Sequence, residues 1–382
     1  MGLKISRRSN IAPFMVMEVM RAAALREAAG ADVIHLEVGQ PSTGAPAAVI
    51  AAAHDALRKD RLGYTDALGV PALRERIARY YRERYAVTID PSRVVVTTGS
   101  SGAFLLAFLA AFDAGDAVAV SEPYYPGYRN ILQALDVTPA TFPTALENGF
   151  QPTVAQLDGL APSTVGLIIA SPANPTGSML SDSALRDIAA WCVRRSVRLI
   201  SDEIYHGITF AAAAQTALAV TQDAIVINSF SKYFSMTGWR LGWMVIPAEL
   251  VRVVERLAQN LFISPPTLAQ LAAIAAFDCS EELDRNVARY GRNRDRLIDG
   301  LGHAGLGQIA PADGAFYIYA HLPGTGLSSA VFCDRLLREA GVAATPGIDF
   351  DQTRGHDYVR FCFAGSEADM TEAVRRILAW RL

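Results

Sequence analysis

Short apolar runs alternate with longer amphipathic segments through the middle of the chain. The runs are rich in β-branched side chains and occupy residues 93–99, 117–123, 164–172, 197–203 and 224–230. Apolar residues recur at helical spacing between most of them, for example over 100–112 and 181–196. This alternation predicts an α/β fold with a mostly parallel sheet that is covered by helices on both faces.

The pattern changes after about residue 280. There it predicts a long charged helix (281–299), short strands near 315–322 and 357–364, and a helix between those strands (328–341). Residues 11–30 predict a short amphipathic helix that ends at Gly30. We therefore expect a large domain over 46–280 and a smaller α+β domain built from 1–45 and 281–382.

Composition narrows the class of protein. Of 382 residues 51% are hydrophobic and 19% are charged, which is typical of a globular chain with a large core. The net charge is −3 and no basic stripe is present, so we expect no nucleic acid partner. The scattered cysteines and histidines show no metal-ligand spacing and predict neither a metal site nor disulfides, as in a cytoplasmic protein. No apolar run is long enough to predict a membrane span.

Polar or glycine-rich residues follow four of the predicted strands. The four segments are "TTGSSG" (97–102), "SPANPTG" (171–177), "SDEIYHG" (201–207) and "NSFSK" (228–232). Because a parallel sheet brings its strand ends to one edge, where ligands of open α/β sheets bind, these segments predict a single site.

The residue types in these segments indicate a phosphorylated cofactor. Backbone N–H groups at the start of a helix attract phosphate, and hydroxyls with a fixed arginine add further hydrogen bonds. The predicted phosphate ligands are Ser100, Ser101, Gly102, Ser229, Ser231 and Arg240.

A lysine stands beside this predicted phosphate site. Lys232 lies 30 residues after Asp202, a spacing that suits a cofactor held by a Schiff base and paired through its ring nitrogen with a carboxylate. Asn174 and Tyr205 are placed to hydrogen-bond a phenolate oxygen, and Tyr125 to stack on the ring. We expect burial and nearby cations to lower the pKa of Lys232.

Three motifs, "SFSKYFSMTGWRLGW" (229–243), "SPANPTG" and "SDEIY", together resemble the pyridoxal-phosphate enzymes of fold type I, the aspartate-aminotransferase-like class I/II. The resemblance extends over nearly the whole chain, from "LEVGQPS" (36–42) to "YVRFCFAGSE" (358–367). It implies a seven-stranded type of large-domain sheet, pyridoxal 5'-phosphate as cofactor and a homodimer with shared active sites.

The resemblance also implies individual roles. Lys232 would form the Schiff base and act as the catalytic acid–base, with Asp202 and Tyr205 as the other catalytic residues. Tyr64 matches the tyrosine that reaches the phosphate of the neighbouring subunit. The implied substrate ligands are Gly39, Asn174 and Arg360, of which Arg360 grips the α-carboxylate.

The implied activity is transfer of an amino group from an L-amino acid to a 2-oxo acid. A C–S β-lyase or another fold-type I enzyme is the alternative, since the same core residues serve these reactions. A cofactor-sensing regulator is disfavoured because the residues before "LEVGQPS" contain no helix-turn-helix pair. The apolar segment with Ile11, Pro13, Phe14 and Met15 favours neutral or aromatic substrates.

Overall fold

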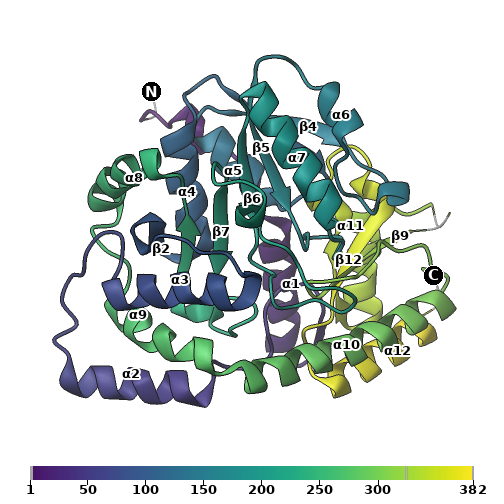
Figure 1. The fold of residues 1–382 in the computed structure, drawn as a ribbon. Coiled ribbons are helices and arrows are strands. Elements are labelled where there is room, and N and C mark those ends of the chain that lie inside the picture. Colours follow the sequence, from purple (N-terminus) through teal and green to yellow (C-terminus); the bar gives the residue numbers. More distant parts are fainter. Residues whose placement is uncertain (1–2, 323, 325, 381–382) are drawn as a thin grey trace.

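The computed structural model describes residues 3–322, 324 and 326–380, and places their strands in three sheets (Figure 1). The strands are β1 (Ile34–His35), β2 (Val94–Thr97), β3 (Ala117–Glu122), β4 (Thr138–Pro143), β5 (Thr164–Ala170), β6 (Arg198–Asp202), β7 (Ile225–Ser229), β8 (Gly242–Val245), β9 (Tyr317–His321), β10 (Val342–Ala343), β11 (Thr345–Pro346) and β12 (Tyr358–Cys362). The helices are α1 (Met15–Ala28), α2 (Ala47–Lys59), α3 (Pro71–Tyr85), α4 (Gly99–Ala111), α5 (Pro126–Ala134), α6 (Val154–Asp158), α7 (Asp182–Arg195), α8 (Ala248–Leu261), α9 (Thr267–Ala273), α10 (Ser280–His303), α11 (Ser329–Arg335) and α12 (Glu367–Ala379).

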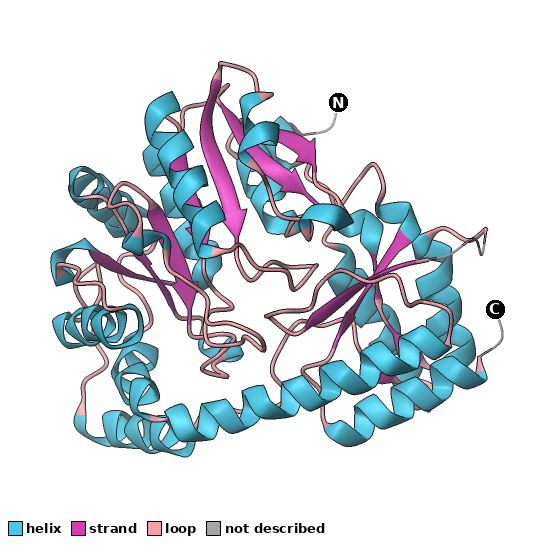
Figure 2. Ribbon diagram, turned by 45° about the vertical axis from the view of Figure 1, so that its right-hand side comes forward, coloured by secondary structure: helices cyan, strands magenta, loops and turns pink. Residues whose placement is uncertain are grey.

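The largest sheet has seven strands in the order β2-β8-β7-β6-β5-β3-β4. Strands β3 to β7 pair in parallel, whereas β8 runs antiparallel to both of its neighbours, β2 and β7. The mostly parallel sheet expected from the sequence is confirmed, and helices cover it on both faces (Figure 2).

The sequence pattern predicted five of these seven strands and missed β4 and β8. Strand β4 lies at the edge of the sheet and leaves most of its side chains at least partly exposed, so it lacks a strong apolar run. Strand β8 has only four residues. In contrast, all five residues of β7 are buried, and a fully buried isoleucine such as Ile227 contributes about 2 kcal/mol through the hydrophobic effect.

The two smaller sheets join the beginning and the end of the chain. Strand β1 pairs in parallel with β10, and β11-β12-β9 form an antiparallel sheet. The long helix α10 extends from the side of the seven-stranded sheet to the side of the three-stranded sheet and packs along α12 (Figures 1 and 2). It extends four residues beyond the predicted end, so Gly300 lies inside the helix and does not end it. Glycine is needed there because α12 packs closely: a Cβ on Gly300 would lie 2.5 Å from Val374 of α12.

No helix within the described residues combines the length and the hydropathy that a bilayer span requires.

Candidate active site

The four polar segments after the strands meet at one edge of the seven-stranded sheet. Strands β5, β6 and β7 are parallel neighbours, and β2 has the same direction because two antiparallel pairings through β8 separate it from β7. Asn174 follows β5, Asp202 ends β6, and Lys232 follows β7 by three residues. The sheet topology therefore brings these three side chains to the same region.

Lys232 is the half-buried amine of this region. Its Nζ donates a hydrogen bond to the Gly39 carbonyl at 2.5 Å and lies 5.8 Å from the ring centroids of Tyr205 and Phe316. Burial, which removes water from the ammonium group, lowers the pKa of Lys232 to about 8. About a tenth of this amine is therefore neutral and nucleophilic at pH 7, far more than for an ordinary lysine.

Asp202 is a buried carboxylate that accepts two hydrogen bonds from within the chain. The Tyr128 hydroxyl donates to Oδ2 and the Ile204 N–H donates to Oδ1 at 3.1 Å. Burial raises the pKa of Asp202 to about 6, and these donors together with the charge of Lys232 oppose that rise. A cation placed beside the carboxylate would favour its ionised form still more.

Tyr128 is a site residue that the sequence interpretation missed. It lies one turn into α5, three residues after Tyr125, and the two rings pack edge to face with centroids 5.4 Å apart. The i, i+3 spacing in "EPYYPGY" would have placed both tyrosines on one face of a helix that begins at the sheet edge.

Gly39 lies where no larger residue fits. A Cβ on Gly39 would come within 1.8 Å of the Tyr317 hydroxyl, which is in turn 2.8 Å from the Tyr205 hydroxyl. The same glycine accepts the hydrogen bond from Lys232. Its backbone therefore closely approaches both the lysine and the tyrosine pair, as expected for a backbone that must lie against a ligand.

Arg360 lies in β12 and is 1% exposed, between the rings of Tyr317 and Phe350 at 4.4 and 4.8 Å. Its Nε is buried without a hydrogen-bond partner among the described residues. The guanidinium group is held by the Glu37 carbonyl and by Thr345 Oγ1 at 3.2 Å. A buried arginine with spare donor capacity suits a carboxylate ligand.

Arg360 also orients Asn174. Its Nη1 donates to Asn174 Oδ1 at 2.9 Å. Since a guanidinium group can only donate, this contact turns the amide oxygen towards Arg360 and leaves the Asn174 NH₂ group to donate elsewhere.

The hydroxyl groups predicted to bind phosphate lie at the end of β7. Ser229 Oγ donates to Ser231 Oγ at 2.9 Å, and both residues are buried. Arg240 is exposed and uses one guanidinium nitrogen to donate to the Thr237 carbonyl at 3.0 Å. It adopts a left-handed backbone conformation (φ +52°) that turns the chain into β8.

The start of α4 lies beside Arg240. A Cβ on Gly99 would be 2.6 Å from Arg240 Nη2, and the N-cap residue Thr98 makes no side-chain cap. Gly99, Ser100 and Ser101 form the first turn, whose N–H groups have no partner within the helix. Gly102 is the fourth helical residue, so its N–H donates to the Thr98 carbonyl in the first bond of the helix, and a Cβ there would make only ordinary contacts; its predicted role stays a prediction.

Tyr125 and Tyr64 differ sharply in their surroundings. Burial raises the pKa of Tyr125, and the charges of Asp202, Arg240 and Arg360 all act on it, which places its hydroxyl among the predicted ligands. Its ring packs edge to face with Phe14 at 5.8 Å. Tyr64, in contrast, is 83% exposed.

Comparison with known proteins identifies relatives over the whole chain. The family model of aminotransferase class I and II matches residues 31–377. The valine–pyruvate aminotransferase of Mycobacterium tuberculosis is 49% identical over 381 residues, which cover 99% of this chain and 98% of the relative. A putative aminotransferase from Silicibacter pomeroyi has a crystal structure with 51% identity, a TM-score of 0.93 and 99% coverage of both chains. The aspartate aminotransferase of Thermus thermophilus, solved with maleate, has 30% identity and a TM-score of 0.94, with 99% of this chain and 100% of that one covered.

Proposed function

The chain belongs to the class I and II aminotransferases and transfers an amino group from an L-amino acid to a 2-oxo acid, and on that premise we propose that pyridoxal 5'-phosphate is bound at Lys232. The observation that carries the proposal is the half-buried Lys232 amine, with a pKa of about 8, among the buried residues Asp202, Arg360, Ser229 and Ser231. A structural lysine would instead be exposed or paired with a carboxylate.

The chemistry of the residues fits each part of this cofactor. Its ring nitrogen suits Asp202, its phenolic oxygen suits the free donor of Asn174 and the Tyr205 hydroxyl, and its aldehyde suits Lys232. Its ring suits stacking on Tyr125. Its phosphate suits the following groups: Ser100, Ser101, Gly102, Ser229, Ser231 and Arg240. When bound, the cofactor supplies an electron sink for negative charge on the substrate α-carbon.

The chain's own residues supply binding and proton transfer. Arg360 binds the substrate α-carboxylate, and Gly39 and Asn174 complete that subsite. Lys232, once free of the cofactor, would take the proton from the substrate α-carbon and deliver it to the carbon that had been the cofactor's aldehyde carbon, a role that suits an amine whose pKa is near neutrality.

The second subunit is part of the proposal. A homodimer would explain why Tyr64 is 83% exposed, since its proposed role is to reach the phosphate in the neighbouring subunit. We assign residues 46–280 to the large domain and residues 1–45 and 281–382 to the small one, in line with the pairing of β1 with β10. A cytoplasmic location accords with four free cysteines.

Neutral aliphatic amino acids are the proposed substrates. The support is the name of the 49%-identical relative, a valine–pyruvate aminotransferase, together with the apolar contact of Phe14 with Tyr125. β-Elimination is the competing reaction, because it needs the same lysine and the same carboxylate-binding arginine.

The test supplies purified protein with pyridoxal 5'-phosphate, one L-amino acid and pyruvate, and identifies products. We expect valine to give its 2-oxo acid and alanine in equal amounts, and the Lys232→Ala variant to give neither. Release of pyruvate and ammonia from β-substituted amino acids, without alanine formation from any donor, would instead establish the lyase.

A further inference from the structure

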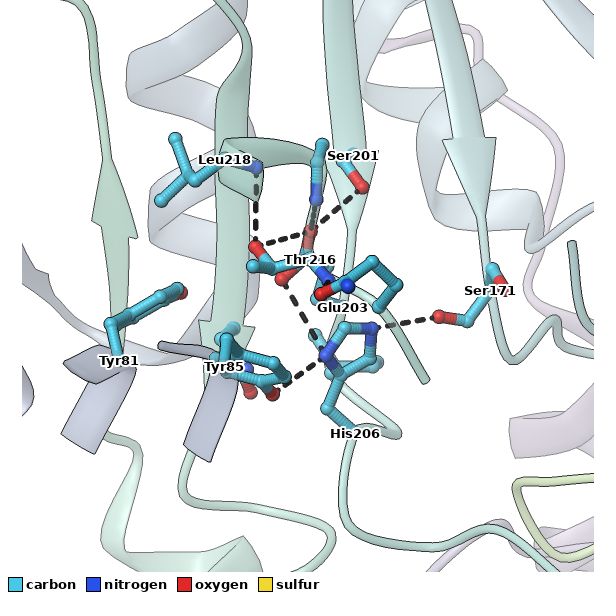
Figure 3. Close-up of polar contacts among 12 residues, drawn as sticks. Tyr81, Tyr85, Ser171, Ser201, Glu203, His206, Thr216 and Leu218 are labelled. Atoms are coloured by element: carbon cyan, nitrogen blue, oxygen red, sulfur yellow. Dashed lines mark hydrogen bonds and ion pairs between the residues drawn. The ribbon is translucent and has the colours of Figure 1, made fainter. Parts of the chain in front are cut away.

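A buried polar network is built around Glu203 and His206, in the turn that follows β6 (Figure 3). Glu203 Oε1 accepts hydrogen bonds from Ser201 Oγ at 3.1 Å, Thr216 Oγ1 at 3.1 Å and the Ala217 N–H at 2.8 Å. His206, two residues beyond Ile204, is 3% exposed and has partners at both ring nitrogens. Nothing in the proposed reaction uses either side chain.

The partners of His206 fix its proton. Nε2 lies 3.0 Å from the Ser171 carbonyl, which can only accept, so Nε2 carries the hydrogen. Burial lowers the pKa of His206 to about 3, so the ring is neutral and Nδ1 has a lone pair. The Tyr85 hydroxyl, 2.7 Å away at the end of α3, therefore donates to Nδ1.

Glu203 and His206 do not form an ion pair, although Oε2 and Nδ1 are 3.6 Å apart. Burial raises the pKa of Glu203 to about 8 and lowers that of His206, so both side chains are predominantly neutral at pH 7. The hydrogen bond to Ser171 is consequently a neutral, directional contact, and its effect is geometric.

Ser171 begins the segment that carries Asn174. Its N–H donates to the Asp202 carbonyl at 3.4 Å, and its carbonyl accepts from His206 at 3.0 Å. Both backbone polar groups of Ser171 are therefore held: its N–H by Asp202, the last residue of β6, and its carbonyl by His206, in the turn after β6. His206 is also the next residue after Tyr205, which ties Asn174 and Tyr205 to the same ring.

We propose that His206 is a positioning residue that fixes the 171–174 segment against Tyr205, and thereby sets the spacing of the two donors for the cofactor's phenolic oxygen. The inference rests on the proposed function for the identity of that ligand. Tyr85 contributes indirectly, because its hydroxyl donates to His206 Nδ1 and so holds the imidazole in place.

The test measures the pH midpoint of the visible absorption band of the protein loaded with pyridoxal 5'-phosphate. Donors to an anionic oxygen lower the proton affinity of the bound cofactor, so a displaced Asn174 should raise the midpoint by about one pH unit in His206→Phe. His206→Gln, whose amide N–H can occupy the place of Nε2–H, should stay closer to wild type. Tyr85→Phe should shift the midpoint in the same direction by less.

A second readout uses the protein without cofactor. Amide hydrogen exchange over residues 171–176 should become faster in His206→Phe, and by more than in the rest of the sheet. The matched control is Trp191→Phe, which breaks a hydrogen bond of another buried ring, from Nε1 to the exposed Asp158 at 2.9 Å. It should lower stability without changing either readout.

A wild-type midpoint and wild-type exchange over 171–176 in His206→Phe would overturn the proposal. If that variant does not fold, Tyr85→Phe decides by the same two measurements. If wild-type protein develops no visible band with the cofactor, the proposed function fails, whereas the exchange experiment still decides whether His206 fixes the segment.

Discussion

The two ends of the candidate active site are built in different ways. At the ring end, Asp202 and Tyr205 are buried and Lys232 is half-buried, and all three already have hydrogen-bond partners within the chain. At the phosphate end, Arg240 is exposed and the first turn of α4 has no side-chain cap. Tyr64, also assigned to that end, is 83% exposed.

The two ends therefore have different proposed tasks. The ring end must hold charges at set positions in a medium from which water is excluded, which only pre-formed contacts can do. The phosphate end would bind the doubly charged phosphate of the proposed cofactor, whose own oxygens supply the missing acceptors. We therefore expect substitutions at the ring end to reduce turnover, and substitutions at the phosphate end mainly to weaken cofactor binding.

The largest effect is expected for Asp202→Asn. The amide has no charge to stabilise a protonated ring nitrogen, and loss of about 4 kcal/mol of electrostatic stabilisation lowers kcat about 10³-fold. Cofactor affinity, measured by titration of the visible band, should change much less than kcat. A kcat within tenfold of wild type would remove Asp202 from the proposed chemistry.

The second prediction concerns Glu203, the residue after Asp202, and how the free energy of unfolding of the whole protein depends on pH. The pKa of Glu203 rises from an ordinary 4.5 to about 8, so the protonated form is favoured by folding. The stability that this gives is complete below pH 4.5 and is lost as pH rises towards 8. Between pH 5 and 8 the free energy of unfolding of wild type should therefore fall by about 3 kcal/mol relative to Glu203→Gln.

Urea unfolding of the cofactor-free wild type and Glu203→Gln proteins at pH 5, 6.5 and 8 checks this prediction. Because other titrating groups are common to both proteins, the difference between them isolates Glu203. Parallel curves would mean that Glu203 is ionised in the folded protein.

A smaller effect is expected for Tyr128→Phe. Loss of the hydroxyl removes a donor to Asp202, which raises the pKa of that carboxyl above its value of about 6. Activity should fall about tenfold near pH 6 and recover as pH increases. A pH–rate profile of kcat/KM provides the measurement, and a uniform loss at every pH would count against this role.

The smallest effect is expected at the phosphate end. Tyr64→Phe should weaken binding of pyridoxal 5'-phosphate about fivefold, the loss of one hydrogen bond, while kcat at saturating cofactor stays near wild type. Mixing it with an inactive Lys232→Ala partner would show whether the tyrosine acts across subunits. An unchanged dissociation constant would argue against Tyr64 as a phosphate ligand.

The sequence predicted the parts of the site that follow from topology. Asn174, Asp202 and Lys232 each come directly after an apolar run, and parallel strands must end at one edge. Tyr128 lies 74 residues before Asp202, and its contact depends on how α5 packs against the sheet. The bond from His206 to Ser171 likewise depends on the path of two turns, which periodicity does not specify.

The length of α10 illustrates the same limit. Glycine after a charged helix usually marks its end, and the sequence predicted an end at 299. Here Gly300 instead allows α10 to pack closely against Val374 of α12, and the helix continues to His303. Local signals cannot reveal a contact between residues 74 positions apart.

The proposed role of Lys232 is tested most directly by locating the residue to which the cofactor is attached. Protein incubated with pyridoxal 5'-phosphate is reduced with borohydride, digested and analysed by peptide mass. The chain has two other lysines, Lys4 and the exposed Lys59, which serve as internal controls. We expect a stoichiometric adduct on Lys232 and none on the other two. Equal labelling of Lys59 and Lys232, or labelling that persists in Lys232→Ala, would contradict the proposed role.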